Sequence, residues 1–317
     1  MPTERLGVGG MSPESRTFYD KQLLLRARGA QVFRKYGRTA RVPRNQGANI
    51  NFRRFESIVG STTALTEGTP PSETNATFVN VSATLAQYGA YARVSDILEL
   101  QGIDPVIAEY VANFGEALGE SLDLVTRDVL VAGTTVQFAS TSTSRGNVGS
   151  GMLCSAAELR EAVRTLKAAN AKPIEDGKYI AFISERTWFD LMADTNIVNA
   201  YLYSKERGEA NPLTKGAVGD WMGIRFVETQ LATRGASLGL SGADVEYTML
   251  MGKDAYGVTE LEAEQAKVYV KPRGSGGTSD PLDQISTIGY KAAFAAVRLN
   301  EAFMVRIDHV TSSSQAA

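Results

Sequence analysis

The chain has 317 residues but only one cysteine, Cys154, and one histidine, His309. A single cysteine excludes any intramolecular disulfide, and with it the small secreted folds that such bonds hold together. One histidine also excludes the zinc sites that need two or more, and one cysteine cannot complete the ligand set. The catalytic and metal-binding chemistry open to this chain is therefore narrow.

Long apolar runs are absent as well. No stretch of 18 or more apolar residues occurs, which predicts no membrane span and no membrane partner. The first ten residues include Glu4 and Arg5 but lack the apolar region of about 7–15 residues that marks a signal peptide. We therefore expect a protein that is made and kept in the cytosol.

The sequence motifs of common enzymes are missing. There is no G-x-x-x-x-G-K-[ST] motif, and the glycine-rich stretch 274–277 is more typical of a flexible loop than of a phosphate site. His309 lies beside Asp308 near the chain end, where a catalytic triad would need a buried cleft. Cys154 has no histidine near it in sequence to act as a base, which favours a buried or loop thiol over a nucleophile. We expect no enzyme, and no catalytic residue, cofactor or metal.

Charge is balanced overall but unevenly distributed. The 33 basic and 35 acidic side chains argue against a dedicated nucleic-acid-binding protein. From Arg16 to Arg54, however, eleven basic residues accompany one acid, Asp20, so this segment carries +10 and the rest of the chain −12. Such a segment is expected to meet nucleic acid or the acidic body of a neighbouring subunit, with a solvated helix face as the alternative. Its apolar residues predict a docked helix over 13–36, broken at Gly37.

Strands are predicted between Gly47 and Asp96. Alternation of apolar and polar residues in Ile50–Arg53 and Thr77–Ser82 is typical of β-structure. The intervening residues 60–75 contain two glycines and two prolines, which predicts a turn or loop. The result is a long two-stranded hairpin with little core of its own, which we expect to lie on another chain because isolated hairpins are marginal in water.

A long helix is predicted from Asp104-Pro105, because aspartate is a good N-cap and proline suits the first helical position. Apolar residues then recur every three or four positions over about 28 residues, at Ile107, Val111, Phe114, Leu118, Leu122, Val125 and Val129. Four acids lie off this stripe: Glu109, Glu116, Glu120 and Asp123. We interpret them as a solvated or subunit-facing surface rather than as catalytic carboxylates.

The second half of the chain mixes helices and strands. Ser155 and Glu158 have the spacing of a capping box that opens a helix to about Ala169, after an expected loop over 131–153. Another helix is expected over 185–193, and strands are expected over 179–184, 224–229, 245–251, 267–271, 286–299 and 302–309. Because no regular βαβ period is present, the predicted fold class is α+β.

Several short stretches occur in an order that is similar to one known family. They are Phe52-Arg53-Arg54-Phe55, Leu65 to Pro70, Gln87 to Tyr91, Val94-Ser95-Asp96, Asp280 to Gln284, Gly289-Tyr290-Lys291 and Arg306-Ile307. Together with the basic arm, the hairpin and the long helix, this series resembles the major capsid protein of tailed bacteriophages, which has the Hong Kong 97 type fold. The resemblance covers about residues 15–310.

The resemblance implies a domain organisation. Residues 1–46 would be an N-terminal arm, and 47–100 an extended loop that overlies a neighbour and begins the peripheral domain. Residues 101–154 would be the peripheral domain with its spine helix, and 155–265 the axial domain that meets its copies around fivefold and quasi-sixfold axes. Residues 266–317 would return to the peripheral sheet and end the chain.

The resemblance also implies a function. Copies would assemble as hexamers and pentamers into an icosahedral shell that encloses double-stranded DNA, in the host cytoplasm during assembly and in the virion capsid afterwards. The implied partners are other copies, a portal protein, the packaged DNA by weak contact and, as an open option, a decoration protein. A separate scaffolding protein is also implied, because this sequence has no large scaffolding segment.

Within this scheme we predict eight charged residues at inter-subunit contacts: Arg26, Arg28, Arg34, Arg38, Arg41, Arg53, Arg54 and Glu67. Arg53 and Arg54 are expected to pair with acids of an adjacent subunit, and Glu67 with a basic neighbour. Two other functions stay open: an encapsulin-type cellular compartment, which shares the fold, and a nucleic-acid-binding protein acting through the basic arm.

Overall fold

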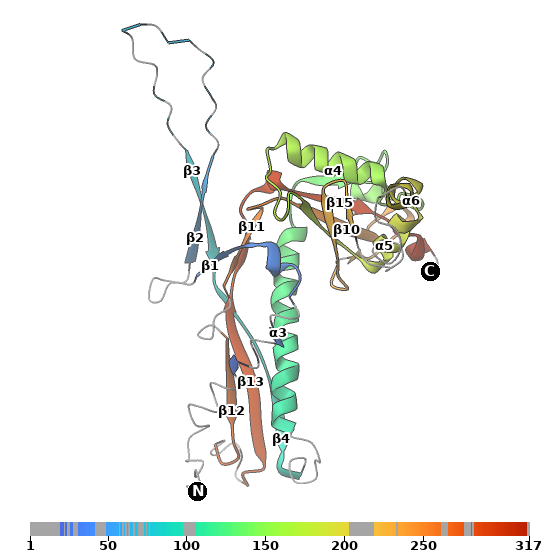
Figure 1. Ribbon diagram of the computed structural model, residues 1–317. Helices are drawn as coiled ribbons and strands as arrows, with labels where there is room; N and C mark the ends of the chain where they lie inside the picture. Colours follow the sequence, from blue (N-terminus) through green and yellow to red (C-terminus); the bar gives the residue numbers. More distant parts are fainter. Residues whose placement is uncertain are drawn as a thin grey trace.

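The computed structural model describes residues 20–27 (except 22, 24 and 25), 31–41, 49–97 (with gaps between 57 and 76), 106–202, 219–260 (except 233), 266–275 and 280–315 (except 281). Figure 1 shows a long helix beside a long narrow sheet, a lobe of helices and strands at one end of that helix, and a two-stranded ribbon that projects away from both. Within the described residues, no helix is long and apolar enough to cross a membrane.

The long helix is α3, Val106–Val131, and it confirms the helix predicted from the apolar stripe. Its buried Val111, Leu118 and Leu122 pack into the largest core cluster. Beside α3 lies a three-stranded antiparallel sheet in the order β12 (Ala266–Lys271), β13 (Ile285–Phe294) and β4 (Ala86–Ser95). The ring centroids of Phe114 on α3 and Tyr290 on β13 are 5.4 Å apart, so one face of this sheet is covered by the helix.

The lobe is built on a second, seven-stranded sheet. Six strands follow the order β5 (Val136–Phe138), β15 (Met304–His309), β10 (Val245–Met251), β6 (Tyr179–Ile183), β8 (Ile224–Glu228) and β7 (Asp220–Trp221), and β9 (Arg234–Gly235) also pairs with β10. The helices of the lobe are α4 (Ala156–Ala168), α5 (Glu185–Ala193) and α6 (Thr195–Leu202). A second core cluster joins Leu159 and Leu166 of α4 to the strands through Ile183, Leu250 and Ile307.

Two smaller sheets link these parts. Strand β1 (Arg38–Ala40) pairs parallel with β11 (Tyr256–Thr259), which pairs antiparallel with β14 (Ala296–Arg298). The ribbon in Figure 1 consists of β2 (Asn49–Phe55) and β3 (Phe78–Thr84), paired antiparallel. Short 3₁₀ helices occur at Arg34–Tyr36, Arg145–Asn147, Leu240–Gly242, Glu301–Phe303 and Ser312–Gln315.

The predicted elements and the structure differ in several places. The strand expected over 302–309 begins at Met304, after a 3₁₀ turn, and β4, β11 and α6 were not predicted as separate elements. The helix expected over 13–36 is wrong at its end, because residues 31–33 are not helical and Arg34–Tyr36 is a separate 3₁₀ turn; residues 13–19 lie outside the described part. The strand expected over 286–299 is interrupted at Ala295, and its two pieces, β13 and β14, join different sheets. The loop expected over 131–153 contains the short strand β5 and a 3₁₀ turn.

Candidate assembly surfaces

The β2–β3 ribbon is anchored at one end and bare at the other. At its base, Ile50, Phe52 and Ala83 are buried in a small cluster with Ala295 and Leu299. At its far end the paired Phe55 and Phe78 are 71% and 56% exposed, with their ring centroids 6.4 Å apart. Large aromatic side chains left in solvent on a ribbon without its own core are typical of a surface that is covered in an assembly.

The base of the ribbon packs against a glycine of the body, Gly257. A Cβ atom at Gly257 of β11 would lie 2.6–2.9 Å from three ring atoms of Phe52, so only glycine leaves room for the ring. Arg54 adds a polar anchor, because its Nη1 donates to the carbonyl oxygen of Leu299 at 3.0 Å. These contacts fix the direction in which the ribbon leaves the body.

The two ribbon arginines named from the sequence have different surroundings. Arg54 is half-buried and has a second intramolecular partner, since its Nη2 lies 3.6 Å from Glu56 Oε1. Arg53 is exposed, and its guanidinium carbon lies 5.9 Å from the centroid of the Phe78 ring. No carboxylate of the described residues pairs with Arg53, so Arg53 is the more available of the two for an acid on another molecule. Glu67 lies exposed in a turn next to Gly68, whose φ of 78° is left-handed.

The arm arginines contact their own chain. Arg26 Nη1 lies 3.1 Å from Glu116 Oε1 on α3, and Arg41 Nε lies 3.1 Å from Glu260 Oε2. Arg34 is buried and donates to the carbonyl oxygen of Thr259, which is at 2.7 Å from its Nη2. Arg38 donates to the carbonyl oxygen of Arg53 at 3.2 Å. Two of the arm arginines, Arg26 and Arg41, therefore pair with acids of their own subunit, and the contacts of the arm with other molecules stay a prediction. Arg28 lies outside the described residues.

Asp123 holds the arm onto α3. The prediction that this acid faces solvent or a subunit is wrong, because its side chain is fully buried. Its two carboxylate oxygens each accept a backbone N–H at 3.0 Å, from Val32 and from Arg34. Burial raises the pKa of the Asp123 carboxyl despite these hydrogen bonds. The other acids of the predicted set behave as expected where they are described: Glu109, Glu116 and Glu120 are exposed.

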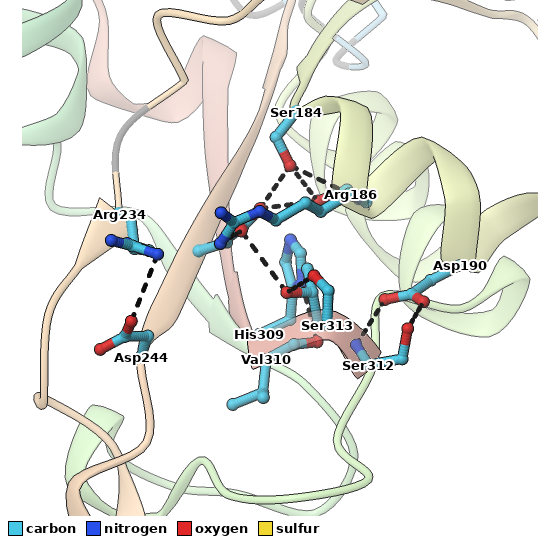
Figure 2. A network of polar contacts seen from close by, with 12 residues as sticks. Ser184, Arg186, Asp190, Arg234, Asp244, His309, Val310, Ser312 and Ser313 are labelled. Carbon is cyan, nitrogen blue, oxygen red and sulfur yellow. Dashed lines mark hydrogen bonds and ion pairs between the residues drawn. The ribbon is translucent and has the colours of Figure 1, made fainter. Parts of the chain in front are cut away.

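A buried polar network fastens the end of the chain to the lobe (Figure 2). Glu246 on β10 accepts hydrogen bonds from Ser184, Thr187 and Thr311, and Arg186 lies 3.7 Å from it. Asp190 on α5 accepts from the backbone N–H and the hydroxyl group of Ser312. Both buried acids of this network, Glu246 and Asp190, accept hydrogen bonds, which is typical of polar groups that stabilise a fold rather than bind a ligand.

The two residues considered for nucleophilic chemistry are both buried. The thiol of Cys154 is enclosed, and burial raises its pKa to about 12, so almost no thiolate exists at neutral pH. His309 Nε2 lies 2.9 Å from the hydroxyl group of Thr248, and burial lowers the pKa of its imidazole. Both side chains are parts of the packed interior, which agrees with the buried thiol predicted for Cys154.

Comparison with known proteins assigns the family. The model of a family described as phage capsid protein matches residues 79–307. This chain belongs to the phage capsid protein family. Family members are structural proteins, so the chain is a major capsid protein whose function is to form the shell of the virion.

Solved phage capsids share the fold of this capsid protein over nearly its whole length. The capsid of cyanophage Pam1 is 16% identical, with a TM-score of 0.68, over 98% of this chain and 97% of that chain. The capsid of Ralstonia phage GP4 is 13% identical, with a TM-score of 0.69, over 98% and 95%. The structure titled Mycobacterium phage Che8 is 15% identical, with a TM-score of 0.60, over 87% and 90%. No curated protein matches the sequence.

Sequence reasoning missed residues that anchor the arm, the ribbon and the end of the chain to the body of the capsid protein. Asp123 was assigned to the wrong face, and Gly257 and Glu246 were not singled out. Glu246 does carry a signal, since it is the one charged residue in the otherwise uncharged strand Val245–Met251. A charge within such a strand indicates a buried and fully paired acid.

Proposed function

We propose that copies of this capsid protein associate into hexamers and pentamers that close an icosahedral shell around the double-stranded DNA of a tailed bacteriophage. The observation that carries the proposal is the β2–β3 ribbon, which extends beyond the core of its own chain and ends in exposed Phe55 and Phe78. A surface of this kind needs a partner, and identical copies repeated by symmetry supply one for every subunit. The family and the fold shared with solved capsids support the same reading.

The domain organisation follows from the same proposal. The arm would comprise residues 1–46, and the ribbon within 47–100 would be the extended loop that overlies a neighbour. The peripheral domain would be α3 with the β12–β13–β4 sheet, drawn from 101–154 and 266–317 together with β4. The axial domain would be the lobe of 155–265, and because β5 and β15 lie in the seven-stranded sheet, residues 136–138 and 304–309 would belong to it as well.

The proposal also includes the other components of the particle and the compartment in which it assembles. A separate scaffolding protein would guide assembly in the host cytoplasm, a portal protein would occupy one vertex, and a decoration protein stays an option. Packaged DNA would be held by confinement rather than by tight contact. The arm's intramolecular ion pairs with Glu116 and Glu260 support this, because those guanidinium groups are already engaged.

Arg53 offers the sharpest test of assembly through the ribbon. We expect Arg53→Glu to leave the subunit folded but to prevent shells, because a carboxylate would then face the acid of the neighbour. Lys167→Glu, at an exposed position on α4, changes charge by the same amount and serves as the matched control. Size-exclusion chromatography with light scattering, run with the scaffolding protein present, reads the outcome. Normal shells from Arg53→Glu would contradict the proposed role of this residue.

A second measurement concerns the contents of natural particles. Nuclease-protected double-stranded DNA inside particles made of this chain is the result that we expect. Particles that instead hold a cargo enzyme would assign the chain to a cellular compartment of the encapsulin type, and the phage function would be wrong.

A further inference from the structure

The strand β4 forms an uncovered edge of its sheet. In the order β12–β13–β4 the two outer strands are β12 and β4, and within the described residues β4 pairs with β13 alone. It is ten residues long, or about 33 Å at about 3.3 Å per residue. Seven of the ten residues are exposed, including Tyr91 at 67%, so the described part of the chain leaves this edge open to solvent.

The register shows which backbone groups lie on the free side of β4. The N–H of Asp96 donates to the carbonyl oxygen of Gln284 at 3.0 Å, and in an antiparallel pair such bonded positions alternate along the strand. The even-numbered residues of β4 therefore hydrogen-bond to β13, and the odd-numbered residues direct their N–H and C=O groups away from the sheet. Four residues with outward groups that make no backbone hydrogen bond within the described part of the chain are Gln87, Gly89, Tyr91 and Arg93.

The opposite edge of the same sheet is protected against pairing. The outward N–H of Val268 on β12 donates to Oδ1 of Asp20 in the arm at 2.9 Å, and β12 also carries two exposed lysines. Covering segments and lysines are common means by which proteins prevent an edge strand from pairing. Strand β4 contains no proline and no lysine, its one charged residue is Arg93, and its register with β13 runs without a bulge. A long edge of this kind is a template for another strand.

The sequence of β4 is complementary to itself in antiparallel pairing. Outward groups meet outward groups only where odd-numbered residues oppose odd-numbered residues, and a register centred on Ala90 meets this condition. It places Tyr91 opposite Gly89 of the other copy, an aromatic–glycine pair of the kind that stabilises glycines in sheets. It also places Arg93 opposite Gln87, and the two Arg93 side chains are then about 20 Å apart. A register centred on Tyr91 would instead set two tyrosine rings against each other.

We propose that β4 pairs antiparallel with β4 of a second copy of this chain across a twofold axis at Ala90, so that two three-stranded sheets become one sheet of six strands. The inference rests on the proposed shell, because icosahedral symmetry includes the twofold axes that such a contact needs. It adds to the shell a joint made by backbone hydrogen bonds between two subunits. Because these bonds lie in the plane of the sheet, both faces of the sheet stay available for other contacts.

The first experiment locates the twofold axis with Ala90→Cys in the full-length protein. Ala90 is exposed, and in the proposed register it opposes its own copy as a non-hydrogen-bonded pair with Cα atoms about 4.5 Å apart, which a disulfide can span. Oxidation of assembled shells should therefore give covalent dimers, and the natural Cys154 is buried and does not compete. Ala86→Cys, also exposed and on the same face of β4, is the matched control, because its copy would be about 26 Å away. Shells of A90C without dimers, or equal dimers from both variants, would overturn the inference.

The second experiment tests which side chains oppose each other. Gln87→Arg would place two arginine pairs across the axis and should lower the yield of A90C dimers by about three- to tenfold, because like charges directly opposite are unfavourable. Gln87→Glu changes the same position but faces Arg93, so it should keep or raise the yield. Adding Arg93→Glu to Gln87→Arg should restore the yield, and circular dichroism with thermal melting verifies that each variant folds. Equal yields from Gln87→Arg and Gln87→Glu would contradict the proposed register.

Failure of the proposed function and failure of this inference give different results. If wild-type protein forms no shells under any condition, the proposed function fails and the contact between copies fails with it. If A90C forms shells that contain no covalent dimers after oxidation, the shell stands and the β4 pairing alone is wrong. Gln87→Pro removes one outward N–H without removing a bond to β13. A loss of shells from Gln87→Pro together with no A90C dimers would mean that the edge receives a different strand, which also refutes the inference.

Discussion

The contact between Phe52 of the ribbon and Gly257 of the body allows a quantitative prediction. The ring of Phe52 fills the space above Gly257, where a methyl group would come within 2.6–2.9 Å of the ring. Gly257→Ala should therefore destabilise the ribbon base by about 1–3 kcal/mol, as overpacking of a closed site does. Phe52→Ala removes a ring that is only 4% exposed, and we expect a cost of about 3–5 kcal/mol.

The combination of the two changes is the informative variant. Once the ring is gone, the methyl group of Gly257→Ala meets empty space, so the second change should cost much less than it does alone. The expected coupling between the two sites is about 1–3 kcal/mol, in the sense that the double mutant is more stable than the sum of the single changes. Hydrogen exchange of the β2 and β3 amides measures this, because it reports local opening as well as global unfolding. Strictly additive costs would refute the claim that Phe52 and Gly257 form one packed joint.

Three further predictions concern buried groups. Asp123→Ala leaves the backbone N–H groups of Val32 and Arg34 without acceptors, so it should lower the free energy of unfolding by about 2–3 kcal/mol, as measured by urea titration. The control Glu120→Ala, at an exposed position of the same helix, should change that free energy little. Equal effects of the two changes would contradict the anchor role of Asp123. Burial lowers the pKa of His309 in the folded state below the ordinary 6.5, so the unfolded chain binds the proton at a higher pH than the folded chain does. The free energy of unfolding should therefore fall as pH drops below about 6.5, by up to about 1.4 kcal/mol per pH unit. His309→Gln should remove that part of the pH dependence in thermal melts, and an unchanged slope would refute it. Cys154 should stay unreactive towards thiol reagents at neutral pH until denaturant is added; fast labelling of the native protein would disprove its burial.

Periodicity was sufficient to predict the long helix and the two strands of the ribbon, but not the shorter elements such as β11 and α6. The spacing of apolar residues after Pro105 predicted α3, and alternation predicted β2 and β3, because both patterns follow directly from helix and strand geometry. The cap at Ser155 was also predicted, and its hydroxyl group accepts from the N–H of Glu158. The carboxylate of Glu158, however, accepts from Gln137 and from the backbone of Ser140. The reciprocal half of a capping box depends on which donors the fold brings close, and local sequence does not specify them.

Asp123 shows why the buried side of α3 was underestimated. The predicted stripe follows Leu118 and Leu122, but Gly119, Asp123, Thr126 and Leu130 form a second buried row at spacings of 4, 3 and 4. A hydrophobicity pattern does not detect this row, because two of its buried members are polar: Asp123 accepts from the backbone of the arm, and Thr126 donates to the carbonyl oxygen of Leu122 within the helix. The charges of the arm presented the same difficulty: a total of +10 indicates acidic partners, but only the fold shows that Glu116 and Glu260 of the same chain are among them.

Negative-stain electron microscopy of the purified chain, with and without its scaffolding protein, tests the central claim most directly. We predict closed, uniform shells, or rings of five and six subunits as their assembly units. A stable 34.1 kDa monomer at high concentration, with no assemblies even when scaffold is supplied, would contradict the account.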